Sequence, residues 1–333
     1  MKTLLGKLLS NYGKTYFSPR SFNNHFGVPF SLSNTESYHD FGIFEVGMSK
    51  GGEIKKLSHM IKPHVGVITN IAEAHIENFK SLKEIAKEKA EIINSINKNG
   101  TLILNRDDKF YEYINRLAKL KKIKTISFGF SKNSDVYPIY SINKKKKKVL
   151  KIKVIDETIS LKIGNINVYN ILSSLAVLRA LNLNPQKILK IFYSFESLEG
   201  RGKTYLINRF KTTFKLIDES YNANPLSVKN AIVNFGKIKK DKFKKYLLLG
   251  DMLELGKKSD YYHKNLSKFI NNTDIDKIFV YGDKILNTYK HTHKNKRGNI
   301  LNHKSEFEKN FSQIIKKNDY LMIKGSNATG LNN

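Results

Sequence analysis

The side chains best suited to chemistry lie in residues 65–96, which read VGVITNIAEAHIENFKSLKEIAKEKAEIINSI. A polar loop in this stretch carries Glu73, His75 and Glu77, and a lysine, Lys89, follows within an apolar stripe. A lysine in such a stripe is costly unless its charge is paired, removed or carried to solvent. Two interpretations stay open: the stem packs while the ammonium reaches solvent or a carboxylate, or the lysine serves a functional site.

A strand, a loop and a helix must position these groups. The β-branched apolar run at residues 65–68 is typical of a strand buried on both faces of a parallel sheet. Ser81 and Glu84 have the spacing of a capping box, which predicts a helix from there to about Asn97. The apolar stripe lies on this helix and comprises Leu82, Ile85, Ile92, Ile93 and Ile96.

A second predicted strand, Phe41–Val46, brings a carboxylate to the same place. Glu45 lies at its carboxyl end, just before a glycine. Open α/β sheets bind ligands in the crevice at the carboxyl ends of their strands. We therefore expect Glu45, His75 and Lys89 to converge on one crevice.

The remaining chain repeats the order of strand, polar loop and helix. In the first half we expect strands at residues 101–105 and 123–128 and a small antiparallel section at residues 136–163. Asp107 and Asp108 are interpreted as turn residues, and the five-lysine run at 144–148 as a solvated hairpin tip.

The charged, flexible segment Glu199–Gly202 predicts a domain boundary. Beyond it, strands are expected at residues 214–217, 246–249, 277–280 and 320–323. Their polar loops predict a second open α/β sheet with functional loops along one edge.

Composition narrows the class of protein. The chain has 333 residues, no cysteine and a formal net charge of +30. Its length favours two domains, and the lack of cysteine excludes disulfides and thiolate metal sites. No apolar run reaches the roughly 20 residues of a membrane span. The lysines are scattered, not clustered with aromatic residues, so we expect no nucleic-acid binding and a soluble, cytoplasmic protein.

Several segments together resemble the Mur ligase family, specifically the members that add D-alanyl-D-alanine to a UDP-N-acetylmuramoyl-tripeptide. DESYNANPLS and LLGDMLELG form the most specific pair. The other segments are FNNHFGVP, FEVGMSKGGEI, VITNIAEAHIENF, NVYN, EGRG and IKGS. The resemblance implies an α/β fold in which residues 1–198 form the central ATP-binding domain, and residues 199–333 form a Rossmann-like C-terminal ligase domain.

The resemblance also implies an activity. ATP would phosphorylate a carboxylate to an acyl phosphate, and the amine of the dipeptide would then attack it during peptidoglycan precursor synthesis in the cytoplasm. ATP and Mg²⁺ are the implied cofactors, the tripeptide nucleotide and D-alanyl-D-alanine the implied partners, and a monomer the implied state. The alternatives are another Mur-type or folylpolyglutamate-like amide ligase, a non-catalytic fragment or a basic nucleic-acid-binding protein.

Site residues are carried over from the matching motifs. Glu45, His75 and Lys89, the last as a carbamate, resemble the magnesium-binding and catalytic groups. The nucleotide-binding residues implied are Asn167, Asn170, Arg201, Asp218 and Asn222, and the substrate-binding residues are Asn23, Asn24, Lys324 and Ser326.

The sequence departs from the family pattern at three places. Ile166 stands where many members have histidine, and Asn327 stands where many have arginine. The third departure is that the chain begins in the helix after the family's phosphate loop, without that loop or the N-terminal uridine-binding domain. From this we expect the chain as given to be incomplete and inactive in ligation.

Overall fold

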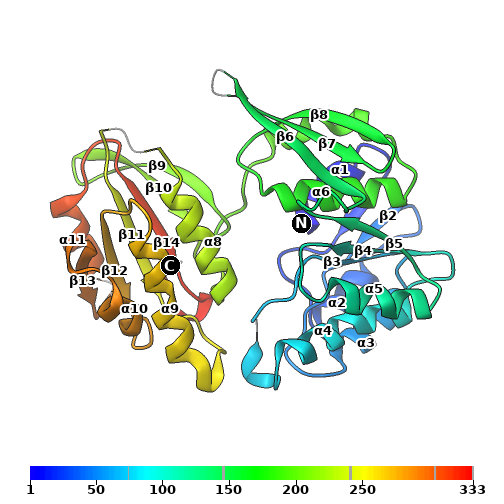
Figure 1. Ribbon diagram of the computed structural model, residues 1–333, viewed down its shortest axis with the longest axis horizontal. Coiled ribbons are helices and arrows are strands. Elements are labelled where there is room, and N and C mark those ends of the chain that lie inside the picture. The colour runs from blue at the N-terminus through cyan, green and yellow to red at the C-terminus, as the bar shows by residue number, and fades with distance from the viewer. Residues whose placement is uncertain (74, 145–146, 240–241, 304, 332–333) are drawn as a thin grey trace. The chain divides into compact units, whose positions relative to one another are not determined.

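The computed structural model describes residues 1–73, 75–144, 147–239, 242–303 and 305–331. The chain folds as two compact units (Figure 1). The first comprises residues 1–71 and 79–196, and the second comprises residues 72–78 and 197–333. The short segment Ala72–Asn78 thus packs with the second unit although strand and helix on either side of it belong to the first. The boundary expected between residues 198 and 199 stays a prediction.

The first unit is built on a six-stranded sheet in the order β3-β4-β5-β6-β7-β8. Strands β3 to β6 are parallel, and β6 to β8 form the expected antiparallel section. The strands are β3 (Val65–Ile68), β4 (Thr101–Asn105), β5 (Lys124–Phe128), β6 (Val136–Lys144), β7 (Lys147–Val154) and β8 (Glu157–Ile163). Positions 145–146 of the predicted hairpin tip lie outside the described residues.

A separate pair of parallel strands, β1 (Thr15–Phe17) and β2 (Phe41–Ile43), completes the strands of this unit. The predicted strand Phe41–Val46 was therefore too long, and Glu45 lies beyond its end. The reason is local: the backbone N–H of Gly47 donates to the carbonyl of Asn23, 2.7 Å away, so the chain pairs with a loop there.

Helices cover both faces of the first sheet. The helices are α1 (Lys2–Leu9), α2 (Gly27–Ser33), α3 (Glu53–Ile61), α4 (Leu82–Ala90), α5 (Tyr111–Leu120), α6 (Val168–Ala180) and α7 (Ile191–Ser194). Helix α6 lies across one face, with α1 beside it, and α5 packs on β4 and β5 (Figure 1). Every residue from Ile171 to Leu178 is buried, as expected for a helix enclosed on all sides.

Helix α4 ends earlier than the predicted helix. Ser81 caps it as expected, with its Oγ accepting from the N–H of Glu84 at 3.3 Å. At Ala90 the helix gives way to a tighter 3₁₀ segment, Glu91–Ser95. That segment packs against α3, where the Ser58 hydroxyl donates to Ser95 Oγ at 2.9 Å. Contact with this neighbouring helix accounts for the switch from α-helix to 3₁₀ helix.

The second unit has a six-stranded sheet in the order β13-β12-β11-β14-β10-β9, parallel except for the β9–β10 pair. Its strands are β9 (Lys203–Arg209), β10 (Thr212–Asp218), β11 (Lys245–Gly250), β12 (Lys277–Tyr281), β13 (Arg297–Leu301) and β14 (Tyr320–Lys324). Its helices are α8 (Pro225–Gly236), α9 (Ser259–Asn271), α10 (Leu286–His291) and α11 (Ser305–Ile314). The expected second open sheet is thus present, with β9 and β13 added to its edges.

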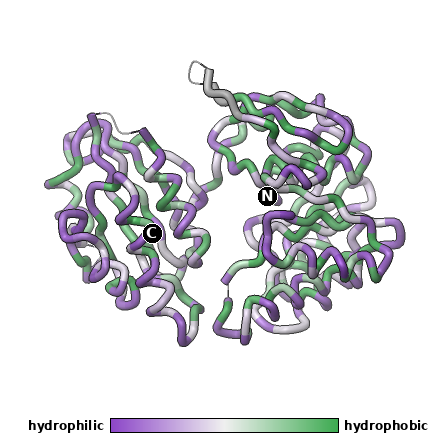
Figure 2. The backbone as a smooth tube through the Cα atoms, viewed as in Figure 1, coloured by the Kyte–Doolittle hydropathy of each residue, from purple (hydrophilic) through white to green (hydrophobic). Residues whose placement is uncertain are grey.

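Alternation along β11 builds two cores in the second unit. Leu247 and Leu249 face the cluster formed with α8 and α9, whereas Tyr246 and Leu248 face the cluster formed with α11. All of β11 is buried. Figure 2 shows hydrophobic residues concentrated in the strands of each unit and hydrophilic ones in its outer loops. Among the described residues, no helix combines the length and apolar character needed to span a bilayer.

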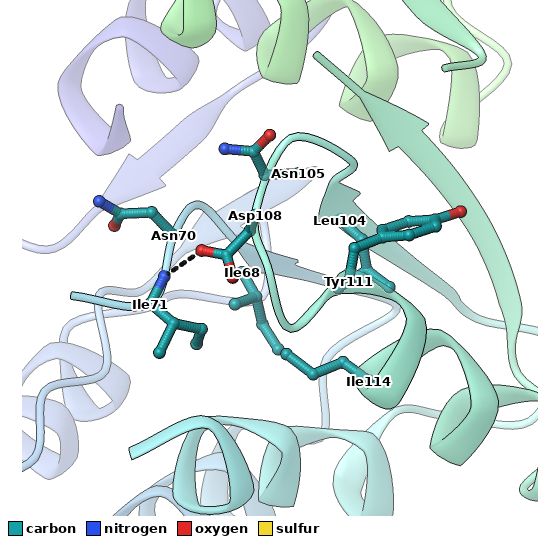
Figure 3. Close-up of a pocket in the computed structure, with 8 residues that line it drawn as sticks. All are labelled: Ile68, Asn70, Ile71, Leu104, Asn105, Asp108, Tyr111 and Ile114. Atoms are coloured by element: carbon teal, nitrogen blue, oxygen red, sulfur yellow. Dashed lines mark hydrogen bonds between the residues drawn. The ribbon is translucent and has the colours of Figure 1, made fainter. Parts of the chain in front are cut away.

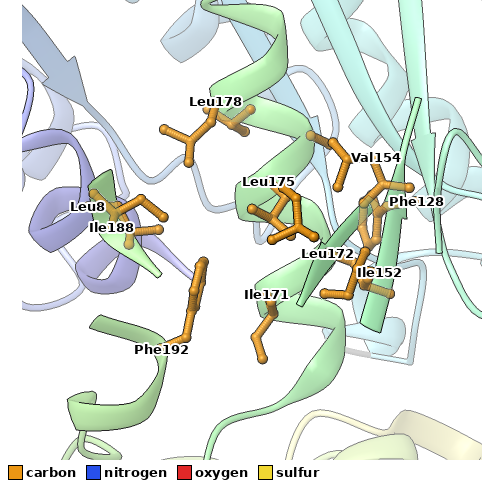
Figure 4. Packing of buried hydrophobic residues seen from close by; sticks show 14 of the residues in the cluster. Leu8, Phe128, Ile152, Val154, Ile171, Leu172, Leu175, Leu178, Ile188 and Phe192 are labelled. Carbon is orange, nitrogen blue, oxygen red and sulfur yellow. The ribbon is translucent and has the colours of Figure 1, made fainter. Parts of the chain in front are cut away.

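The core of the first unit depends on α6, whose apolar side chains meet the sheet on one side and α1 and α7 on the other (Figure 4). Leu175 is 1% exposed there. Leu175→Ala should lower the free energy of unfolding by about 2 to 5 kcal/mol, because it removes buried methyl groups and leaves a cavity.

Urea denaturation measures this change. Leu120→Ala on α5 is the control, because Leu120 is 73% exposed and its loss should cost at most about 0.5 kcal/mol. Equal effects of the two substitutions would contradict the placement of α6 at the centre of the core.

Candidate functional site

In the first unit, the loops after β3 and β4 are joined by hydrogen bonds. The Asp108 carboxylate accepts from the N–H of Ile71 at 2.6 Å, and the amide of Asn105 donates to the Thr69 carbonyl at 3.1 Å. The same loops line a cavity of about 10 Å³, room for one water molecule (Figure 3). Asp108 thus does more than the turn role expected for it, because it ties the loop after β3 to the loop after β4.

Lys89 reaches this junction from α4. Its Nζ donates to the carbonyl of Asn70 at 2.9 Å. Burial lowers the pKa of its ammonium, and the negative charge of Asp108 partly opposes that shift. Lys89 is half-buried, and its ammonium is held by a loop carbonyl within the influence of a carboxylate. Its functional role stays a prediction.

Glu45 lies next to one of the two predicted substrate amides. Its Oε1 accepts from Asn23 Nδ2 at 3.0 Å, and its Oε2 is 3.7 Å from the ammonium of Lys2. The chain passes so close to Asn23 that a Cβ on Gly47 would come within 2.9 Å of the Asn23 side chain. The neighbouring Asn24 instead uses its side-chain oxygen at the start of α2, where it accepts from the N–H of Gly27 at 2.9 Å.

His75 belongs to the segment that packs with the second unit. Its Nδ1 lies 2.5 Å from Glu254 Oε2, and the Glu77 N–H donates to the Glu254 carbonyl at 3.2 Å. His75 and Glu254 both have left-handed backbone conformations, with φ of +56° and +61°. Nine other described non-glycine residues share this conformation, so it does not by itself mark a functional site.

The expected convergence of Glu45, His75 and Lys89 does not occur within one unit. Glu45 and Lys89 belong to the first unit, and His75 packs with the second. Within the part of the chain that the structure describes, no three His, Asp or Glu side chains are grouped so that they could hold a metal. The metal-binding set therefore stays a prediction.

The two asparagines predicted to face the adenine, Asn167 and Asn170, lie at different positions at the start of α6. Asn167 is the N-cap of the helix, and its side chain accepts from the N–H of Tyr169 at 2.9 Å. Asn170 lies in the first turn, next to Tyr169, whose hydroxyl donates to Asp107 at 3.0 Å. Burial and then Asp107 raise the pKa of Tyr169 to about 12. Tyr169 stands within the NVYN motif but was assigned no role, because its partner lies 62 residues away in the sequence.

In the second unit, three loops leave the carboxyl ends of β10, β11 and β14. Asp218, at the end of β10, accepts from the N–H groups of Gly200 at 2.7 Å and Ser220 at 3.1 Å and from the Ser220 hydroxyl. Asn222 accepts from the N–H of Ala223 at 2.8 Å. These two predicted nucleotide contacts therefore also shape the loop that carries them.

Lys324, at the end of β14, is 2% exposed and binds the same loop. Its Nζ donates to the carbonyls of Asn222 at 3.0 Å and Glu219 at 3.3 Å, and it lies 3.5 Å from the Glu219 carboxylate. Burial lowers the pKa of Lys324, and the charge of Glu219 acts in the opposite direction. Glu219 was missed as a site residue, although it stands within the DESYNANP motif.

Ser326 joins all three loops. Its N–H donates to the Asp251 carbonyl at 3.0 Å, and its Oγ accepts from the N–H of Leu253, also at 3.0 Å. The same Oγ lies 3.5 Å from the Ala223 carbonyl. Tyr221 also belongs to the loop after β10. The guanidinium of Arg201, the predicted hinge arginine, lies 4.2 Å from the centre of the Tyr221 ring. The structure thus brings together Arg201, Asp218, Asn222, Lys324 and Ser326 at one edge of this sheet.

Comparison with known proteins identifies both units. Residues 1–178 match the Mur ligase middle domain, and residues 206–327 match the Mur ligase glutamate ligase domain. The chain is 31% identical over 285 residues to the UDP-N-acetylmuramoyl-tripeptide–D-alanyl-D-alanine ligase of Buchnera aphidicola subsp. Baizongia pistaciae, covering 85% of this chain and 60% of that protein. The ligase of the same name from Bacillus subtilis is 30% identical, with 84% and 60% covered. The chain thus spans about 60% of the length of these two relatives.

Solved structures share the fold. MurF from Acinetobacter baumannii superposes with a TM-score of 0.87 at 24% identity, covering 98% of this chain and 71% of that one. MurF ligase from Thermotoga maritima in complex with ADP gives a TM-score of 0.84 at 22% identity, with 99% and 74% covered.

Asp218 offers a test of the loop network. Asp218→Ala should lower the free energy of unfolding by about 1 to 3 kcal/mol without any nucleotide present, because buried donors lose their acceptor. Chemical denaturation followed by circular dichroism measures the change. Asp283→Ala in the same unit is the control, since Asp283 is exposed. Unchanged stability of the Asp218 variant would contradict its part in shaping the loop.

Proposed function

The chain belongs to the Mur ligase family, and from that premise we propose that it joins D-alanyl-D-alanine to a UDP-N-acetylmuramoyl-tripeptide at the expense of ATP. The names of its relatives support this choice of substrates. The observation that carries the proposal is the edge of the second sheet, where residues of three motif loops are fixed together by Lys324 and Ser326. We place the reaction in the cytoplasm and expect a monomer.

The chemistry requires activation of a carboxylate, which is a poor electrophile. A carboxylate oxygen of the tripeptide attacks the γ-phosphorus of ATP, which forms an acyl phosphate and releases ADP. The amine of the dipeptide then attacks the acyl carbon, inorganic phosphate leaves, and the nitrogen loses a proton as the amide forms. Negative charge accumulates on phosphate oxygens in both steps, so preorganised cationic groups and N–H donors must stabilise it.

Glu45, His75 and Lys89 are the residues we propose to hold Mg²⁺. Magnesium prefers oxygen ligands, so Glu45 fits as it stands, His75 offers a nitrogen, and Lys89 fits only as a carbamate. Bound there, magnesium would neutralise the charge of the phosphates. The amine of Lys89 is already held beside Asn70 and under the influence of Asp108, and Asn23 holds the Glu45 carboxylate. These contacts orient both side chains before any ligand binds.

The remaining roles follow the motifs. We propose that Asn167 and Asn170 face the adenine, and that Arg201, Asp218 and Asn222 contact the nucleotide. Asn23 and Asn24 would bind the tripeptide nucleotide.

Lys324 and Ser326 would lie near the dipeptide. Both side chains are buried, with Ser326 5% and Lys324 2% exposed, and both contact the loop after β10. We propose that both lie on the dipeptide side of the site.

The proposed function is tested by incubating the full-length product of the gene with ATP, Mg²⁺, the tripeptide nucleotide and D-alanyl-D-alanine. We expect phosphate release that depends on both substrates, together with a pentapeptide nucleotide in the mass spectrum. Phosphate release with a different amino acid or dipeptide, and none with D-alanyl-D-alanine, would assign the protein to another amide ligase of the family.

Lys89 gives the sharpest test of the proposed catalytic groups. Lys89→Ala in the full-length protein should reduce ligation by at least about a thousandfold, because a site for phosphate-neutralising charge is lost. Short carboxylic acids should partly restore activity if a carbamate is the working form. Steady-state phosphate release measures both effects.

Lys83→Ala and Lys87→Ala are matched controls, since both lysines lie on the same helix and are exposed. Turnover by Lys89→Ala equal to that of these two variants would overturn the assignment.

A further inference from the structure

A buried histidine of the second unit has no part in the proposed chemistry. His263, on α9, is 0% exposed. Its Nδ1 lies 2.8 Å from the Ser259 carbonyl, and its Nε2 lies 3.0 Å from the backbone nitrogen of Met252. A carbonyl only accepts and a backbone N–H only donates, so the imidazole is neutral, with its proton on Nδ1 and its lone pair on Nε2.

The partner of that lone pair belongs to the loop that follows β11. Within this loop, Asp251 accepts from the N–H groups of Ile285 at 2.7 Å and Asp283 at 3.2 Å. On its other side, Leu253 donates to Ser326 Oγ, and Ser326 donates back to the Asp251 carbonyl. Met252 lies between these two contacts, so His263 holds the middle of the segment that fixes Ser326.

We infer that His263 is a positioning residue that sets residues 251–254 and, through them, Ser326, and that protonation of its imidazole releases this loop. The consequence for dipeptide binding rests on the proposed role of Ser326. A protonated imidazole carries a hydrogen on Nε2 as well, and two N–H groups then face each other where one hydrogen bond stood. The loop must move away from α9 or the proton must be expelled.

The surroundings of His263 favour the neutral form. Burial is the largest influence and lowers the pKa of the imidazole. The hydrogen bond to Ser259 and the charges of Asp251 and Asp260 act in the opposite direction, and Lys284 adds to the lowering. A second anchor keeps α9 in place, because the Thr288 hydroxyl donates to the His263 carbonyl at 2.7 Å. This contact holds the backbone of α9 at His263 independently of the loop.

The direction of the pH dependence follows from this lowered pKa. An unfolded histidine binds its proton near pH 6.5, whereas the folded one binds it only at a lower pH. The unfolded state thus binds more protons in that window, so folding stability falls as the pH decreases through it. The stabilisation by His263 is fully present above about pH 6.5.

The test uses amide hydrogen exchange and NMR of the protein without ligands. We expect the Nδ1–H tautomer at pH 7.5 and a protection factor at Met252 that falls about tenfold when the imidazole is protonated, as for loss of one hydrogen bond. His263→Gln keeps an acceptor that does not titrate, so its protection should not change with pH. His263→Leu offers no acceptor and should show the low protection at every pH.

Other results would overturn the inference. These are an Nε2–H tautomer at neutral pH, Met252 protection that is constant through the titration in the wild type, or Gln and Leu variants that behave alike. Binding of D-alanyl-D-alanine, measured by calorimetry on the same proteins, separates this inference from the proposed function. Loss of protection without weaker dipeptide binding would confirm the positioning role and contradict the assignment of Ser326.

Discussion

The ammonium of Lys324 is the charge around which the edge of the second sheet is arranged. It is 2% exposed, and a buried cation is tolerated only where acceptors surround it. Two carbonyls and the Glu219 carboxylate meet that need, and all three belong to the loop after β10. The strand that carries Lys324 lies between β10 and β11, so the constraint joins neighbouring loops. Donors and acceptors are thereby held in position before ligands arrive, as catalysis by electrostatic stabilisation requires.

The first unit also holds a lysine against a loop, but Lys89 is less buried than Lys324. Lys89 donates to a carbonyl of the loop after β3, and Asp108 anchors that loop from the neighbouring strand. The enclosed helix α6 supports this arrangement from the other face of the sheet. In both units a lysine from a regular element reaches a loop at the carboxyl end of a strand. A rigid scaffold thus places groups that loops alone would leave mobile.

The sequence predicted the α/β architecture because buried parallel strands form continuous apolar runs. Strand β4 was predicted to the residue. The edge strands β9 and β13 were not expected, since they are less buried and lack that pattern.

Motifs placed Asp218, Lys324 and Ser326 at one edge correctly, because loops after parallel strands share that edge. His263 was not predicted as a positioning residue, because its partner is the backbone N–H of Met252, which lies in a different segment and leaves no sequence pattern. Likewise, the packing of His75 with the second unit depends on a contact to Glu254 that no local pattern encodes.

The central proposal is that the full-length protein activates the carboxylate of the tripeptide as an acyl phosphate. The most direct test is to label that carboxylate with ¹⁸O and analyse the inorganic phosphate released during ligation by the full-length protein. The account predicts that one labelled oxygen passes from the carboxylate to phosphate, and only when D-alanyl-D-alanine is present. Unlabelled phosphate accompanied by formation of the amide would contradict it.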